Sequence, residues 1–137
     1  YESQQEGMWL MKIQLVSMPV KDPVEAHEIY VSKLGFVSKE FDAEASLAVV
    51  VAPEEQGGTA LLLEPVSGTF AEDYQKAAFD ADLPIMIFSV ADVTSEMSRL
   101  GAAGVTLRPD LDKPDWGLVN LFEDGCGNLL MLQEEPS

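Results

Sequence analysis

The chain has 137 residues, of which 47% are hydrophobic, and this is enough to bury the core of one domain or of two small fused modules. Eight basic and 24 acidic residues give a formal net charge of −16, which argues against binding to nucleic acid or to an anionic membrane surface. A single cysteine leaves no internal disulfide and no apolar run reaches the ~20 residues of a membrane helix, so we expect a cytoplasmic protein.

Residues 1–10 lack the basic start and the apolar centre of a signal peptide, and we expect a tail or an expression remnant there. The segment 12–20 is rich in β-forming residues. A helix is predicted directly after it, with Asp22 as N-cap, Pro23 at its first position and Gly35 as its stop. Strand-like runs follow at 36–42, 46–53 and 59–66, so residues 11–66 are predicted to form one βαβββ module.

Residues 67–83 are polar and connect two similar halves. Phe70, Tyr74 and Ala77 recur at helical spacing, which predicts a short helix within this connector. Tyr74 is also placed to contact a ligand at a pocket rim, although packing between the halves explains it equally well.

The second half repeats the order of the first. A strand at 84–90 leads into a helix capped by Asp92 and ended by Gly104, and strands at 105–110, 117–124 and 128–135 follow. At an offset of about 70 residues Val20 matches Val90 and Asp22 matches Asp92, which favours an internal duplication. Residues 84–135 are therefore predicted to form a second βαβββ module.

Three side chains are candidates for chemistry, each with a plainer explanation. His27 is the only histidine and lies in the middle of the first predicted helix, where a catalytic role requires a partner acid or nucleophile. Glu64 follows an apolar strand, and partial burial there would raise its pKa and make it a base, whereas a solvated glutamate at a strand end is the ordinary alternative. Cys126 has no basic neighbour in sequence to activate it, so we expect a turn cysteine.

Four segments resemble the vicinal oxygen chelate superfamily, which includes glyoxalases, extradiol dioxygenases and bleomycin-resistance proteins. They are KIQLVSMPVKD (12–22), YVSKLGF (30–36), FSVADV (88–93) and WGLVNLFEDGCGN (116–128), the last similar to the closing signature W-G-x-x-x-x-F-x-D-P-x-G-N with Gly125 in place of proline. The resemblance covers residues 11–135 and implies an α+β fold in which two βαβββ modules form cupped mixed sheets with helices on their outer faces.

The resemblance also implies where metal ligands stand in relatives that use a metal. Laid onto this chain, those four positions are Leu15, Leu62, Ile85 and Met131. Hydrocarbon and thioether side chains are poor ligands for hard divalent cations, so we expect no metal and no cofactor.

Strand alternation places a few polar groups beside these apolar residues. The predicted ligand-binding set is Leu15, Ser17, Leu62, Glu64, Ile85, Ile87, Ser89, Met131 and Gln133, with Trp116 at the rim. An apolar floor with sparse polar groups fits a small-molecule pocket, but the same face is equally well filled by side chains or by a dimer partner.

Two functions follow from the resemblance. The first is a protein like the bleomycin-resistance group, which binds a small organic ligand without metal, a cationic one if the acidity serves binding, and which is commonly a homodimer. The second is an enzyme, a lyase or dioxygenase with an atypical metal site, or a metal-free catalyst that uses Glu64 or His27. The acidity alone does not choose between ligand attraction, solubility and a high-salt habitat.

Overall fold

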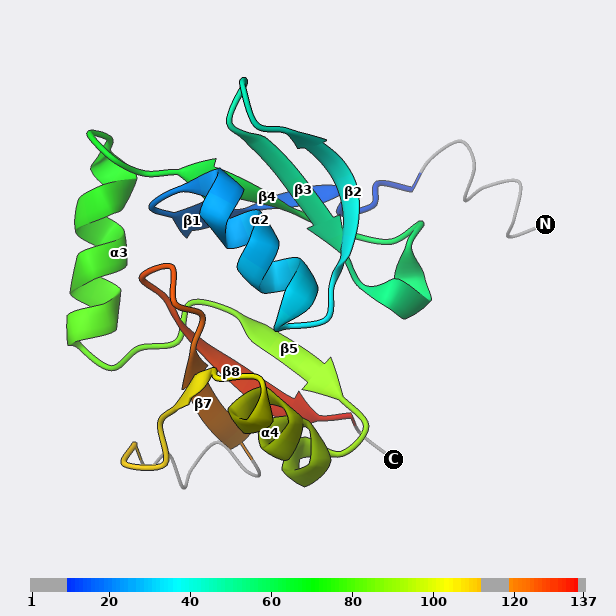
Figure 1. The fold of residues 1–137 in the computed structure, drawn as a ribbon, viewed down its shortest axis with the longest axis vertical. Coiled ribbons are helices and arrows are strands. Elements are labelled where there is room, and N and C mark those ends of the chain that lie inside the picture. The colour runs from blue at the N-terminus through cyan, green and yellow to red at the C-terminus, as the bar shows by residue number, and fades with distance from the viewer. Residues whose placement is uncertain (1–9, 112–118, 136–137) are drawn as a thin grey trace.

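The computed structural model describes residues 10–111 and 119–135. The first half of the chain forms a four-stranded sheet covered by a helix, coloured blue to green in Figure 1. Its elements are β1 (Leu15–Val20), α2 (Pro23–Ser32), β2 (Val37–Asp42), β3 (Leu47–Val51), the 3-10 turn η1 (Pro53–Glu55) and β4 (Ala60–Pro65). The strand order is β1-β4-β3-β2, with β1 parallel to β4 and the other neighbours antiparallel.

The second half repeats this arrangement below the first in Figure 1. Its elements are β5 (Ile87–Val90), α4 (Val93–Ala102), β6 (Thr106–Leu107), β7 (Val119–Glu123) and β8 (Leu129–Glu134), in the strand order β5-β8-β7-β6. Both helices begin at the predicted caps, because the Asp22 carboxylate accepts from the Val24 N–H and the Asp92 carboxylate accepts from the Ser95 N–H. The structure thus confirms an α+β fold of two βαβββ modules.

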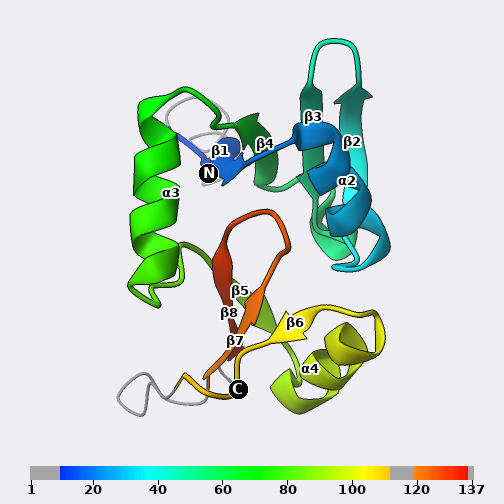
Figure 2. The same ribbon diagram turned by 60° about the vertical axis from the view of Figure 1, so that its left-hand side comes forward.

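The connector contains α3 (Phe70–Asp80), capped by Thr69. Figure 2 shows this helix standing beside β1 of the first module and the strands of the second. Its buried residues are Gln75 and Ala78, whereas Phe70 and Tyr74 are 91% and 58% exposed. The apolar spacing noted in the sequence therefore lies on the outside of this helix.

The two modules share one hydrophobic core, which lies on the helix side of both sheets. It joins residues of α2 and the first sheet to residues of α4 and the second sheet: Met18, Val20, Ala26, Tyr30, Val50, Leu61, Leu63, Val93, Leu100, Phe122, Leu130 and Leu132. The opposite face of each sheet, which we call the first cup and the second cup, carries its own small cluster. Because the shared core occupies the helix-covered face of each sheet, the two cups face away from this core.

A buried polar network ties the modules together beside that core. The Tyr30 hydroxyl donates to Asp124 Oδ2 at 2.6 Å, and Asn128 Nδ2 donates to the same oxygen at 2.8 Å and to the Pro19 carbonyl at 2.7 Å. Gln75 Nε2 donates to Asn128 Oδ1 at 2.9 Å and to Pro19 O at 3.0 Å. The network therefore joins α2, β1, α3 and the β7–β8 turn.

Strand β6 is much shorter than the sequence predicts. The sequence predicted a strand over 105–110, but β6 spans only Thr106–Leu107. Arg108 N–H still donates to Leu121 O at 2.9 Å, and the next residue, Pro109, has no N–H to continue the ladder.

Over the described ranges, no helix has the length and apolar character required to cross a membrane.

Candidate functional site

The first cup places four of the predicted residues on adjacent strands. Ser17 and Leu62 are direct partners in the parallel pairing of β1 with β4. Leu15 is 48% exposed at the start of the edge strand, and Leu62 is half-buried against the cluster of this cup. Ser17 Oγ donates to Glu64 Oε1 at 2.7 Å, so a hydroxyl and a carboxylate lie together at the end of an apolar surface.

The second cup has the same layout with a hollow in it. Ile87 is the direct partner of Met131, and Ser89 is the direct partner of Gln133. A hollow of about 390 Å³ is lined by Pro84, Ile87, Met131 and Gln133. Met131 is 4% exposed and forms the floor, whereas Ile87 is 53% exposed on the edge strand.

Two predicted residues are placed elsewhere or not described. Ile85 precedes β5 and packs against the shared core, and its N–H donates to the Leu129 carbonyl at 3.0 Å. Trp116 lies outside the described residues. Tyr74, the other predicted rim residue, is exposed on α3.

The residues at the four expected metal-ligand positions do not fit a divalent metal. Leu15, Leu62 and Ile85 offer only hydrocarbon, and the Met131 thioether is a weak, soft ligand. Glu64 is the nearby carboxylate of the first cup, and it is a single ligand already bonded to Ser17. In the part of the chain that the structure describes, no group of three or more His, Cys, Asp or Glu side chains could hold a metal ion.

His27 and Cys126 lie outside both cups. His27 Nε2 is 2.8 Å from Ser38 Oγ, and its ring stacks on Phe41 with centroids 4.1 Å apart. Cys126 is buried in the β7–β8 turn, and burial, with the nearby Asp124 carboxylate, raises the pKa of its thiol. A thiol held in its protonated form is a poor nucleophile, which fits the expected turn cysteine.

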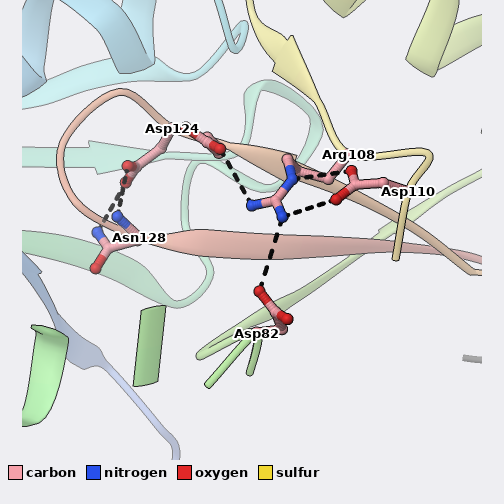
Figure 3. Close-up of polar contacts among 6 residues, drawn as sticks. Asp82, Arg108, Asp110, Asp124 and Asn128 are labelled. Atoms are coloured by element: carbon pink, nitrogen blue, oxygen red, sulfur yellow. Dashed lines mark hydrogen bonds and ion pairs between the residues drawn. The ribbon is translucent and has the colours of Figure 1, made fainter. Parts of the chain in front are cut away.

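Sequence reasoning missed a charged cluster at the margin of the second sheet. The Arg108 guanidinium contacts Asp110 at 2.9 Å, Glu123 at 3.2 Å and Asp82 at 3.7 Å (Figure 3). The hydrogen bond to Asp110 raises the pKa of Arg108, and the same bond lowers the pKa of Asp110. No local sequence motif predicts this cluster, because its members come from the connector, from β7 and from the segment after β6.

Sequence reasoning also missed a hollow that is larger than the one beside Met131. A cavity of about 840 Å³, which we call the intermodule cavity, opens between the two modules. Val16 and Leu61 line it from the first sheet, and Phe88 and Leu132 line it from the second. It forms only when the modules are placed side by side, so neither half of the sequence contains a signal for it.

Comparisons with known proteins agree with this architecture. A model of the Glyoxalase/Bleomycin resistance protein/Dioxygenase superfamily matches residues 12–132. The uncharacterized protein YurT of Bacillus subtilis (strain 168) is 39% identical over 127 residues, which is 91% of this chain and 100% of YurT.

Solved structures share the fold at lower identity. TnmS3, an antibiotic binding protein from Streptomyces sp. CB03234, is 23% identical with a TM-score of 0.68, over 94% of this chain and 99% of TnmS3. The trypanothione-dependent glyoxalase I of Leishmania major is 18% identical with a TM-score of 0.64, over 92% of this chain and 88% of that enzyme. The sequence match and the shared fold lead to one conclusion: this chain belongs to the glyoxalase/bleomycin resistance protein/dioxygenase superfamily.

Proposed function

We propose that this protein binds a small organic molecule against its cupped sheet faces, without a metal ion. The observation that carries the proposal is the chemistry of the second cup. Met131 and Ile87 form an apolar floor in a hollow of about 390 Å³, and Gln133 provides a polar group at its edge. Apolar area supplies affinity and sparse polar groups fix orientation, which is the usual composition of a small-molecule site.

The first cup supplies a complementary polar group. The Glu64 carboxylate is exposed at the strand end and accepts from Ser17, so it presents a fixed negative charge beside Leu62. With a net charge of −16, the whole chain attracts cations over long range. An organic cation is therefore the first ligand class to test, and the antibiotic-binding relative TnmS3 supports an antibiotic-like molecule.

We also propose that a second copy of the chain covers the cups. Leu15 and Ile87 lie on the edge strands β1 and β5 and remain about half exposed. Edge strands with exposed apolar side chains are natural sites of pairing. The buried thiol of Cys126 suits a reducing compartment, which supports a cytoplasmic location.

One measurement tests independence from metal. Protein stripped with chelator is dialysed against Ni²⁺, Zn²⁺, Mn²⁺ or Fe²⁺ and its metal content is determined. We expect no stoichiometric uptake, because Leu15, Leu62, Ile85 and Met131 offer no hard ligand. One tightly held metal per chain would overturn the proposal in favour of a lyase or dioxygenase.

A second measurement tests the cup as the ligand site. Calorimetry with metal-free bleomycin, a cationic glycopeptide, is expected to show binding that weakens about three- to tenfold when salt rises from ~50 to ~500 mM. Met131→Trp fills the hollow and should abolish the heat, whereas Phe41→Trp, on the outer hairpin, should leave it unchanged. Absence of heat at low salt would exclude bleomycin as a ligand. Binding that persists in Met131→Trp would exclude the second cup as the binding site.

A further inference from the structure

The intermodule cavity opens from the shared core between the two modules and reaches the edge strand β5, where Ile87 and Ser89 also line it. Its apolar walls come from β1, β4 and β8, from β5 and the residue before it, and from the segment after α2: Val16, Phe36, Leu61, Met86, Phe88 and Leu132. Leu61 and Leu132 belong to the shared core, so the cavity is an opening into that core. Of the residues that line the hollow beside Met131, only Ile87 also lines this cavity.

The walls of this cavity leave apolar surface in contact with solvent. Phe36, Met86 and Phe88 pack against the shared core but are only partly buried. The Phe36 and Phe88 rings meet edge to face with centroids 5.3 Å apart, so they offer two aromatic surfaces at an angle of 63°. A volume of about 840 Å³ lies within the range of small-molecule sites, which is roughly 300–1,000 Å³.

The polar groups that line the same cavity are mostly acidic. They include Glu54 and Glu55 of η1, Glu96 of α4 and Glu135 after β8. Among the described residues that line the cavity, Arg99 is the only basic one.

Arg99 does not neutralise three of these four acids. Its guanidinium donates to Glu96 at 2.6 and 2.8 Å and to the carbonyls of Lys33 and Leu34, both at 3.1 Å. None of the ion pairs among residues 10–111 and 119–135 includes Glu54, Glu55 or Glu135. The cavity therefore combines an aromatic and aliphatic interior with negative charges that no basic side chain of the described chain offsets.

We propose that the intermodule cavity is a second binding site, and that its ligand is an organic cation with a flat apolar body. The apolar part lies among Phe36, Met86 and Phe88, where burial of its surface supplies affinity. The cationic group faces Glu54, Glu55 and Glu135, and aromatic ring faces add a further attraction for cations. The Met131 floor of the second cup does not line this site, and residues of a single chain form it.

Methyl NMR of methionine distinguishes the two sites directly. Met86 lines the intermodule cavity and Met131 lines the second cup, while Met18 is fully buried and serves as an internal reference. The probes are 2-naphthylmethylammonium, the neutral 2-naphthylmethanol and the anionic 2-naphthoate. We expect the ammonium probe to shift the Met86 signal without shifting Met131, and to bind at least about fivefold more tightly than the alcohol.

Charge variants test the role of the acids. Replacing Glu54, Glu55 and Glu135 together by Gln is expected to weaken the ammonium probe about fivefold and to leave the alcohol unchanged. The matched control replaces Glu40, Glu44 and Glu72, which do not line the cavity, and should change neither affinity. Ala52→Trp, which places a large side chain in the cavity wall, should abolish the Met86 shift.

Several outcomes would overturn the proposal. A shift of Met131 in place of Met86 would assign the probe to the cup. Naphthoate binding as tight as the ammonium probe, or equal losses in the two triple variants, would show that the lining acids do not select the ligand. Absence of any Met86 shift with all three probes would show that the cavity is not a ligand site.

Discussion

At the scale of single residues, Asp124 is the main hydrogen-bond acceptor of the buried polar network. Its carboxylate accepts from the Tyr30 hydroxyl, from the Asn128 amide and from the backbone N–H groups of Cys126 and Asn128. Burial raises the pKa of Asp124, and these four hydrogen bonds oppose that rise without cancelling it. Sequence reasoning treated this aspartate only as part of a closing turn.

The raised pKa of Asp124 predicts a specific pH dependence. The folded protein holds the Asp124 proton to higher pH than the unfolded chain does, so the free energy of unfolding falls as pH rises from about 4 through the raised pKa. The slope is at most about 1.4 kcal/mol per pH unit for one proton. Urea denaturation between pH 4 and pH 7 measures this effect. The unfolding free energy of wild type minus that of Asp124→Asn should decrease as pH rises.

Comparison with Asp124→Asn removes the contribution of every other titrating group that the two proteins share. Tyr30 and Cys126, whose pKa values are raised by burial, do not titrate in this range. An increase with pH in the unfolding free energy of wild type minus that of the variant would show that Asp124 is ionised more easily in the folded state.

Gly127 is the second residue whose identity the structure dictates. Its φ of +101° lies in the left-handed region, and an added Cβ would stand 2.9 Å from Gln75 Cδ. Gln75 cannot move away freely because its amide donates to Asn128, Cys126 and Pro19. Gly127→Ala should therefore cost about 2–3 kcal/mol of unfolding free energy.

Gly57→Ala is the control for this substitution, since a Cβ at Gly57 meets nothing within 4 Å. We expect its unfolding free energy to stay within about 0.5 kcal/mol of wild type in the same urea titration. Equal effects of the two substitutions would mean that the β7–β8 turn tolerates a side chain.

At the scale of elements, β1 and β5 are edge strands of their sheets, and each carries an apolar side chain that is about half exposed, Leu15 and Ile87. If a second copy covers the cups, a charge on β5 should separate the copies. We expect sedimentation equilibrium to give a dimer for wild type at tens of micromolar and a monomer for Ile87→Glu.

The control introduces the same charge on a different element. Val24 is 37% exposed near the start of α2, where an acidic side chain is favourable to the helix, so Val24→Glu should remain dimeric. A monomeric wild type would show that the dimer proposal is wrong, and a single chain would then form the proposed ligand sites.

At the scale of the whole molecule, the sequence predicted what depends on local pattern. Helix caps at Asp22 and Asp92 are short-range features, and the structure contains them. The register that places Ile87 opposite Met131 joins two strands that are distant in the sequence, and strand alternation alone does not fix it. The contact of Tyr30 with Asp124 joins residues 94 positions apart, and no local pattern encodes it. The intermodule cavity and the Arg108 cluster arise in the same way, from the packing of distant segments.

The outward position of the cups has a consequence for how this scaffold changes over generations. Stability resides in the core on the helix side, so exposed cup residues such as Ser17, Ser89 and Gln133 contribute little to it. Substitutions there should be nearly neutral for folding, because surface changes away from special features typically cost under about 0.5 kcal/mol. If the cups bind ligand as proposed, duplicated genes can change these positions, and with them the ligand preference, without passing through unstable intermediates.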